Sequence, residues 1–369
     1  MKIAIDISQI CYQGSGVARY VEQLVEHMIK NDDKNQYLLY GNSMRQKKIL
    51  LDFIYKMKKL NSNIENKIIA MPQTLADILW NKLHILPIEN LIGEVDIFHA
   101  SDWVEPPVKK ALKVTTIHDL LVFKYPGYFT QEIIDTQKRR ISWVLAESNM
   151  VIVDSHTTKN DLIDLFDFPK DKIKVVYPGI SSNFRRQSEE KIREVREKFS
   201  LKNPYILSVG TREPRKNVDK TIEAFDKIKD LFDFDLVIVG KLGWGPDKRS
   251  GDDRVKLLGY VDDKYLPSLY SAASCFVYPS LYEGFGFPIL EAMACGSGVV
   301  TSKGGSLSEI GGKYAVYIDP LDSSSIASAI LKVIKGLDKK TINDAASWAR
   351  SFNWDHTARE IIKIYNSLH

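Results

Sequence analysis

YPSLYEGFGFPILEAMACG, residues 278–296, links the end of an apolar run to a short apolar helix through a glycine-rich turn. Gly284 and Gly286 allow the backbone to approach a ligand closely, and Pro288 suits the first position of a helix. The N–H groups of residues 284–290 are therefore expected to point outward at the positive end of the helix dipole, where an anion binds well. This strand, turn and helix form one unit of the α/β pattern that the rest of the chain repeats.

Two carboxylates, Glu283 and Glu291, bracket this turn. They would repel a bound phosphate unless each faces a hydroxyl group. Glu291 is expected in the first turn of the helix, where side chains tilt toward the helix N-terminus and can reach the same ligand. We expect Glu283 to bind a sugar ring and Glu291 a ribose, with a diphosphate between them on backbone amides. The competing interpretation is that Glu291 only complements the helix dipole, an effect of ~0.3–1 kcal/mol.

Short β-branched runs alternate with helical stretches along the chain, which indicates parallel sheets covered by helices on both faces. The pattern breaks between Pro178 and Pro204, at a loop followed by a charged helix. The chain therefore predicts an α/β fold with two doubly wound, Rossmann-like domains, 1–180 and 181–350, facing a central cleft. A C-terminal helix, 351–369, is expected to pack back across them. The expected strands are 2–7, 36–40, 67–70, 96–100, 113–118, 150–154, 173–178, 205–210, 235–240, 254–259, 275–280, 298–302 and 315–319.

The unusual residues fall at the carboxyl ends of expected strands, where parallel sheets bind their ligands. Any one of these loops could be a tight strand-to-helix turn, but all of them together favour a ligand site in the cleft. Besides the opening stretch, they are Gly14 and Gly16 in QGSGVARY, His118 and Asp119, TREPRKN (211–217) and KLGWG (241–245).

The segment EGFGFPILE, 283–291, resembles the E-x7-E motif of retaining glycosyltransferases of family 4, which have the two-lobed GT-B fold. The resemblance covers nearly the whole chain, through GSGVARY, TIHDLLVFKYP, VGTREPRKN and GVVTSKGGSLSEIGGKYAVYIDP. It implies transfer of a sugar from a nucleotide-activated donor, with the donor held mainly by the C-terminal domain and the acceptor by the N-terminal one. EPRKN with TIHDL is similar to mannosyltransferases that use GDP-mannose, so this donor is favoured, with a UDP-sugar as the alternative.

The resemblance also implies residue roles. Lys216, with Arg215, would neutralise the diphosphate, and Gly16 would approach it from the other domain. His118 would lie near the donor sugar and, with Glu283 and Lys216, form the catalytic set; fixed donors and a lysine suit the charge that develops on a leaving diphosphate. Asp119 either bonds its neighbours or touches substrate. The expected donor-binding residues are Gly16, Thr211, Arg212, Arg215, Lys216, Gly284, Phe285, Gly286, Phe287 and Glu291.

Some positions depart from the family pattern or resemble other motifs. Many relatives carry arginine where this chain has Thr211, so we expect Arg212 or Arg215 to substitute. The triplet 233–235, Asp-Phe-Asp, matches the D-x-D metal motif of another glycosyltransferase fold, but it leads into a strand at the end opposite the ligand. We interpret it as a strand entry with solvated carboxylates and expect no metal and no cofactor. Ser306 with Glu309 matches a capping box.

The composition excludes several classes of protein. A net charge of +4 is too small for a dedicated nucleic-acid binder. The three cysteines lie in or beside apolar runs, which predicts buried free thiols and a reducing cytoplasm. No signal peptide is recognisable, and no apolar run approaches the ~18–20 residues of a membrane span.

Residues 44–60, MRQKKILLDFIYKMKKL, combine basic and apolar side chains in a helical pattern. They form either an ordinary surface helix or one that lies on the inner membrane surface, which would suit a lipid-linked acceptor. The leading interpretation is a metal-independent retaining hexosyltransferase that acts on a glycan or lipid-linked acceptor in polysaccharide or glycoconjugate synthesis. The alternatives are a sugar-nucleotide epimerase of the same fold and a non-catalytic nucleotide-sugar-binding protein.

Overall fold

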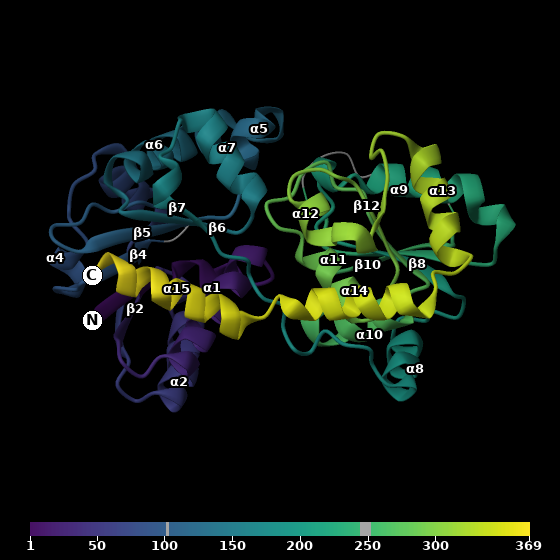
Figure 1. Ribbon diagram of the computed structural model, residues 1–369, viewed down its shortest axis with the longest axis horizontal. Helices are drawn as coiled ribbons and strands as arrows, with labels where there is room; N and C mark the ends of the chain where they lie inside the picture. The colour runs from purple at the N-terminus through teal and green to yellow at the C-terminus, as the bar shows by residue number, and fades with distance from the viewer. Residues whose placement is uncertain (101–102, 244–251) are drawn as a thin grey trace. The chain divides into compact units, whose positions relative to one another are not determined.

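The computed structural model describes residues 1–100, 103–243 and 252–369 (Figure 1). The chain divides into two compact units: unit 1 is Met1–Gly179 with Asn353–His369, and unit 2 is Ile180–Phe352. The last helix, α15 (Trp354–Leu368), therefore belongs to unit 1. It packs along α1 (Gly16–Asn31), where the Asp355 carboxylate contacts His27 Nδ1 at 2.8 Å.

Unit 1 contains a seven-stranded sheet in the order β3-β2-β1-β4-β5-β6-β7. All its strand pairs are parallel, and each of the seven runs predicted in this half forms a strand. The strand order reverses between β1 and β4, which makes this position the switch point of the sheet. The strands are β1 (Lys2–Asp6), β2 (Gln36–Asn42), β3 (Glu65–Ile69), β4 (Ile97–Ala100), β5 (Leu112–Ile117), β6 (Met150–Val153) and β7 (Ile173–Val175).

Helices cover both faces of this sheet (Figure 1). One face packs against α6, α7 and the segment 76–92, where Trp80, Ile141 and Leu162 are fully buried. The other face packs against α1, α2 and α15, whose inner side chains include Leu24, Ile54 and Ile361. The remaining helices of unit 1 are α2 (Lys47–Leu60), α3 (Gln73–Ala76), α4 (Glu89–Ile92), α5 (Leu121–Lys124), α6 (Gln131–Glu147) and α7 (His156–Phe166).

Unit 2 contains a six-stranded parallel sheet in the order β10-β9-β8-β11-β12-β13, and its order reverses between β8 and β11. The predicted α/β class, with two doubly wound sheets, is confirmed. The strands are β8 (Tyr205–Val209), β9 (Asp235–Val239), β10 (Val255–Gly259), β11 (Cys275–Tyr278), β12 (Val299–Thr301) and β13 (Val316–Tyr317). The helices are α8 (Glu189–Lys198), α9 (Val218–Ile228), α10 (Leu266–Ala272), α11 (Phe287–Ala294), α12 (Leu307–Gly311), α13 (Ser323–Ile334) and α14 (Lys339–Ser351).

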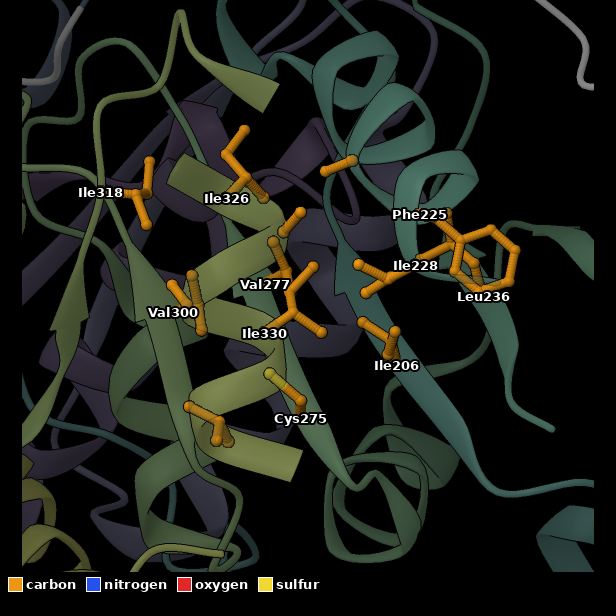
Figure 2. Close-up of a cluster of buried hydrophobic side chains, with 14 of the residues drawn as sticks. Ile206, Phe225, Ile228, Leu236, Cys275, Val277, Val300, Ile318, Ile326 and Ile330 are labelled. Carbon is orange, nitrogen blue, oxygen red and sulfur yellow. The ribbon is translucent and has the colours of Figure 1, made fainter. Parts of the chain in front are cut away.

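One largely aliphatic core cluster of unit 2 lies between its sheet and the helices α9 and α13. Figure 2 shows Ile326 and Ile330 of α13 close to Val277 of β11, with Phe225 and Ile228 from α9 beside β8. Cys275 lies in this core, and all three cysteines are buried free thiols, as predicted. In the part of the chain that the structure describes, no helix combines the length and the apolar character that a membrane span requires.

Candidate active site

The loops that follow β8 and β11 meet at the switch point of unit 2. The first contains the short 3₁₀ turn Pro214–Lys216, and the second runs from Pro279 to the start of α11. The Leu281 N–H donates to the Arg215 carbonyl at 2.8 Å, and the Arg215 guanidinium donates to the Tyr282 carbonyl at 3.2 Å. The two loops therefore hold each other in place through one backbone–backbone bond and one bond from the Arg215 side chain.

The carboxylate of Glu283 is the centre of this arrangement. Its Oε1 accepts from Lys216 Nζ at 2.6 Å, from Ser280 Oγ at 2.6 Å and from the Tyr278 hydroxyl at 2.9 Å. Its Oε2 lies 2.9 Å from Arg215 Nη1. Because Oε1 already accepts three hydrogen bonds, Oε2 is the oxygen better placed to accept a further donor such as a sugar hydroxyl.

The charges of this cluster are strongly coupled. Burial acts to raise the pKa of Glu283, but the charges of Arg215 and Lys216 outweigh it and lower the pKa to about 2. Burial lowers the pKa of Lys216, and the charge of Glu283 opposes that shift. Arg215 also pairs with Glu213 at 2.8 Å, so two cations face two carboxylates. An incoming diphosphate would therefore compete with Glu283 for Lys216 and Arg215.

Helix α11, which follows the glycine-rich turn, begins one residue earlier than the sequence predicted. Gly286 has φ +108°, in the left-handed region that favours glycine, and an added Cβ would lie 2.9 Å from a Leu307 methyl group. The helix begins at Phe287, which puts Pro288 at the second position rather than the predicted first. The prediction that Glu291 lies in the first turn is therefore wrong by one residue. Glu291 is 3% exposed, and its carboxylate accepts from the Tyr270 hydroxyl at 3.0 Å.

Ser306 does not form the predicted capping box. Its side chain makes no cap to the N-terminus of α12, because its hydroxyl lies 2.6 Å from the Phe285 carbonyl and 3.1 Å from that of Glu283. The Ser306 N–H also donates to the Glu283 carbonyl, at 2.9 Å. Ser306 thus holds the glycine-rich turn, a role that sequence reasoning missed. The residue that could have indicated this role is Gly305, because the chain passes so close to the Glu283 turn there that an added Cβ would lie 2.2 Å from the Glu283 carbonyl oxygen.

The other predicted residues of unit 2 lie around this cluster. Thr211 is exposed, and the Arg212 N–H donates to the Lys241 carbonyl at 2.9 Å. Of the KLGWG stretch, residues 244 and 245 lie outside the described residues. Asp235 begins β9, so the D-x-D triplet is at the amino end of that strand. The expectation of a solvated carboxylate is wrong for Asp235, which is 1% exposed and lies 3.5 Å from Lys256 Nζ.

In unit 1, the structure places Gly16 at the start of α1, directly after the N-cap residue Ser15, whose hydroxyl accepts from the Ala18 N–H at 3.1 Å. A Cβ added at Gly16 would meet no atom within 4 Å. The backbone at Gly16 is therefore open to close approach by a ligand. Gly14 has φ +84°, in the left-handed region that favours glycine, so the turn itself requires glycine at this position.

His118 follows β5, and its Nδ1 lies 2.6 Å from Oδ2 of Asp154, which follows the neighbouring strand β6. The Tyr20 ring packs edge-on against the His118 ring with centroids 4.6 Å apart. Burial raises the pKa of Asp154, and the charge of His118 partly offsets this. Sequence reasoning placed Asp154 in a strand and missed that it orients His118. Asp119 accepts a hydrogen bond from the Leu121 N–H at 2.9 Å.

Within residues 1–100, 103–243 and 252–369, no group of three or more His, Cys, Asp and Glu side chains is placed to hold a metal ion.

Known families and structures match both units. Residues 14–184 match the model described as Glycosyltransferase Family 4, and residues 189–350 match Glycosyl transferases group 1. The matches define a nucleotide-sugar-dependent class of enzyme with two Rossmann-like domains, the GT-B fold. The chain belongs to glycosyltransferase family 4.

Individual relatives are similar along their full length. O-antigen chain mannosyltransferase B of Escherichia coli is 28% identical over 390 aligned residues, which cover 100% of both chains. An uncharacterized glycosyltransferase of Methanocaldococcus jannaschii is 27% identical over 95% of this chain and 94% of its own. Among solved structures, Anabaena HepE in complex with UDP and glucose superposes with a TM-score of 0.72 at 19% identity, over 100% of both chains.

Proposed function

We propose that this glycosyltransferase transfers a hexose, with mannose from GDP-mannose favoured, to a glycan or lipid-linked acceptor. In this proposal unit 2 binds the donor and unit 1 the acceptor, in the cytoplasm and in the synthesis of a cell-surface polysaccharide. The E. coli relative named as an O-antigen chain mannosyltransferase supports the choice of sugar. A UDP-sugar is the alternative donor, which the UDP and glucose in the HepE complex support.

The observation that carries the proposal is the cluster of Glu283, Lys216 and Arg215 at the switch point of unit 2. Two adjacent cations and the N-terminus of α11 suit the charge that appears on a leaving diphosphate. The remaining hydrogen-bonding capacity of Glu283 Oε2 suits a sugar hydroxyl. Gly16, with its open backbone, is the proposed diphosphate contact from unit 1, and His118, oriented by Asp154, is the proposed contact to the donor sugar.

The proposed reaction needs no divalent metal, because Lys216, Arg215 and the amides at the start of α11 supply the positive charge that a metal supplies in other enzymes.

The test of this proposal is a transfer assay. The protein is incubated with a panel of GDP- and UDP-sugars and with an extracted fraction of lipid-linked glycans as the acceptor, in the presence and in the absence of excess EDTA. Sugar transfer to the acceptor that persists in EDTA is the expected result. Loss of transfer restored by Mn²⁺ or Mg²⁺ would contradict the metal-independent mechanism, and conversion of the donor to another nucleotide sugar would indicate an epimerase.

A further inference from the structure

Three aromatic rings from distant parts of the sequence form a chain of contacts in unit 1. Besides its contact with His118, the Tyr20 ring of α1 packs edge-on against Trp354 at the start of α15, with the ring centroids 5.5 Å apart. Tyr20 is 2% exposed and Trp354 is 3% exposed. Both rings are therefore held by the packing around them, and one of them lies directly against the proposed contact to the donor sugar.

The hydrogen bond to Asp154 does not by itself fix the plane of the His118 ring. It joins Nδ1 to Oδ2 at 2.6 Å, and the ring can still turn about the line between these two atoms. The Thr158 hydroxyl, from α7, donates to the His118 carbonyl at 3.2 Å and so holds the backbone but not the ring. Tyr20 restricts the turning of the ring, because edge-on packing has a preferred distance and angle, here 76° between the two planes.

The plane of the His118 ring decides what its second nitrogen can reach. Since Nδ1 is committed to the Asp154 carboxylate, a contact from the ring nitrogens to a sugar has to use Nε2. The direction of Nε2 follows from the plane of the ring, and therefore from the position of Tyr20. A catalytic group works only when it is held close to its productive geometry, so a ring that turns freely would lower the rate.

Trp354 lies where the chain enters unit 1 for the second time. Its backbone is packed against Gly179, the last residue of the first segment of unit 1, because a Cβ added at Gly179 would lie 2.2 Å from the Trp354 nitrogen. The Thr357 hydroxyl, farther along α15, donates to the Tyr177 carbonyl at 2.7 Å. The start of α15 is therefore fixed, and its tryptophan gives the Tyr20 ring a firm support.

We propose that Tyr20 and Trp354 are positioning residues for His118. The Tyr20 ring sets the plane of the imidazole, and Trp354 holds the Tyr20 ring in place. Neither residue touches the substrate. The use of His118 in the reaction rests on the proposed function, whereas the positioning of its ring does not, so the two can be tested separately.

NMR spectra of the imidazole rings test the positioning without any substrate. The chain has seven histidines, so ¹³C and ¹⁵N labelling of histidine gives few signals, and a His118→Gln variant assigns the one that matters. In its neutral form we expect His118 to carry its proton on Nδ1, because the Asp154 carboxylate accepts from this nitrogen. We expect Tyr20→Leu to shift the His118 signals and to convert the ring to a mixture of tautomers. Trp354→Leu should cause a smaller change of the same kind.

Two further variants separate the ring contact from a general loosening of unit 1. Tyr20→Phe keeps the edge-on ring and should give the parent His118 spectrum. Tyr40→Leu is the matched control, because Tyr40 is also a buried tyrosine of unit 1 that packs edge-on against other aromatic rings, and it should leave His118 unchanged. Unchanged His118 signals in Tyr20→Leu, or an equal change in Tyr40→Leu, would overturn the proposal. If Tyr20→Leu does not fold, Trp354→Leu decides by the same criteria.

Steady-state kinetics, with the donor that the transfer assay identifies, test what the positioning does for the reaction. We expect Tyr20→Leu to lower kcat roughly fivefold, in line with the loss of one edge-on aromatic contact, and to change KM for the donor by less than about twofold. Tyr20→Phe should restore kcat. A displaced His118 ring with unchanged kcat would retain the positioning and contradict the proposed role of His118 in the reaction. A lower kcat with an unaltered His118 ring would overturn the positioning.

Discussion

Lys216 has two competing partners in the proposed site. It is paired with Glu283 at 2.6 Å and is also the proposed partner of the diphosphate. Lys216→Met keeps the length of the side chain and removes its charge. Loss of a charge-assisted hydrogen bond costs ~1.5–3 kcal/mol, so we expect nucleoside-diphosphate affinity to fall roughly 10- to 100-fold. Titration calorimetry measures this. Lys220→Met, on the first turn of α9, is the control, and equal losses in the two variants would argue against a specific role for Lys216.

Glu283 should make unit 2 sensitive to acid. Its pKa falls from 4.5 to about 2 on folding, so its contribution to stability is complete above about pH 4.5 and is lost as the pH falls toward 2. At ~1.4 kcal/mol per unit of pKa, this contribution is about 3 kcal/mol. We expect Glu283→Gln to lower the free energy of unfolding of unit 2 by about this amount at pH 7 and by much less at pH 2.5.

Urea dependence of hydrogen exchange at the amides of β8 and β11 measures this difference locally. Glu190→Gln, at an exposed position on α8, is the control and should change stability little at either pH. A Glu283→Gln defect of the same size at pH 7 and pH 2.5 would mean that the loss comes from packing and not from the charge of the carboxylate.

At the scale of elements, the strands were predictable and the partners of the site residues were not. The runs of β-branched residues mark buried parallel strands by composition alone, and each forms a strand. The partners that sequence reasoning missed, Ser306 for the Glu283 turn and Asp154 for His118, come from other loops 23 and 36 residues away. Such contacts depend on which strands are neighbours in the sheet, and local spacing does not encode that order.

The turn before α11 gives a prediction about Ser306. Ser306→Ala removes the hydroxyl that lies against the carbonyl groups of Glu283 and Phe285, and leaves the N–H bond in place. A hydrogen bond of this kind is worth ~1 kcal/mol, so we expect a roughly fivefold loss in kcat/KM for the donor and faster amide exchange in residues 283–287. Ser308→Ala, exposed on α12, should change neither. Lower activity with unchanged exchange would show that Ser306 acts otherwise than by holding the turn.

We propose that the exposed face of α2 contacts an anionic membrane surface, the second of the two interpretations of residues 44–60. Leu50, Phe53, Ile54 and Met57 are buried in unit 1, whereas Leu51 and Tyr55 are exposed along with several lysines. Each basic residue near an anionic surface contributes ~1 kcal/mol. We therefore expect the double variant Lys47→Glu, Lys48→Glu to reduce co-sedimentation with phosphatidylglycerol vesicles by at least tenfold. Parent protein that fails to sediment with these vesicles would favour an ordinary surface helix, and Lys339→Glu, Lys340→Glu on α14 controls for net charge.

At the scale of the whole molecule, both units use the same arrangement of strands. Each sheet reverses its strand order once, after β1 in unit 1 and after β8 in unit 2, and glycine-rich or charged loops follow those strands. The sequence predicted the two doubly wound sheets and the functional loops at the carboxyl ends of their strands, because those loops carry recognisable residues, but it did not predict the order of the strands. It did not predict that Lys216 and Arg215 would be neutralised by carboxylates from the same unit, since that depends on side-chain geometry.

This charge balance bears on the stereochemistry of the reaction, and we expect the product to keep the anomeric configuration of the donor. A double displacement needs a nucleophilic carboxylate, but Glu283 has a pKa of about 2 and is bound by Lys216 and Arg215, so it is a poor nucleophile and a poor base. In the remaining route the acceptor oxygen attacks from the face of the leaving group. The bond between the anomeric carbon and the phosphate oxygen breaks, and the new glycosidic bond forms. The acceptor proton passes to the departing phosphate while the two cations stabilise its charge.

The anomeric coupling in the NMR spectrum of the isolated product distinguishes retention from inversion. An α-linked product from an α-configured donor is expected, and a β-linked product would contradict the proposed mechanism.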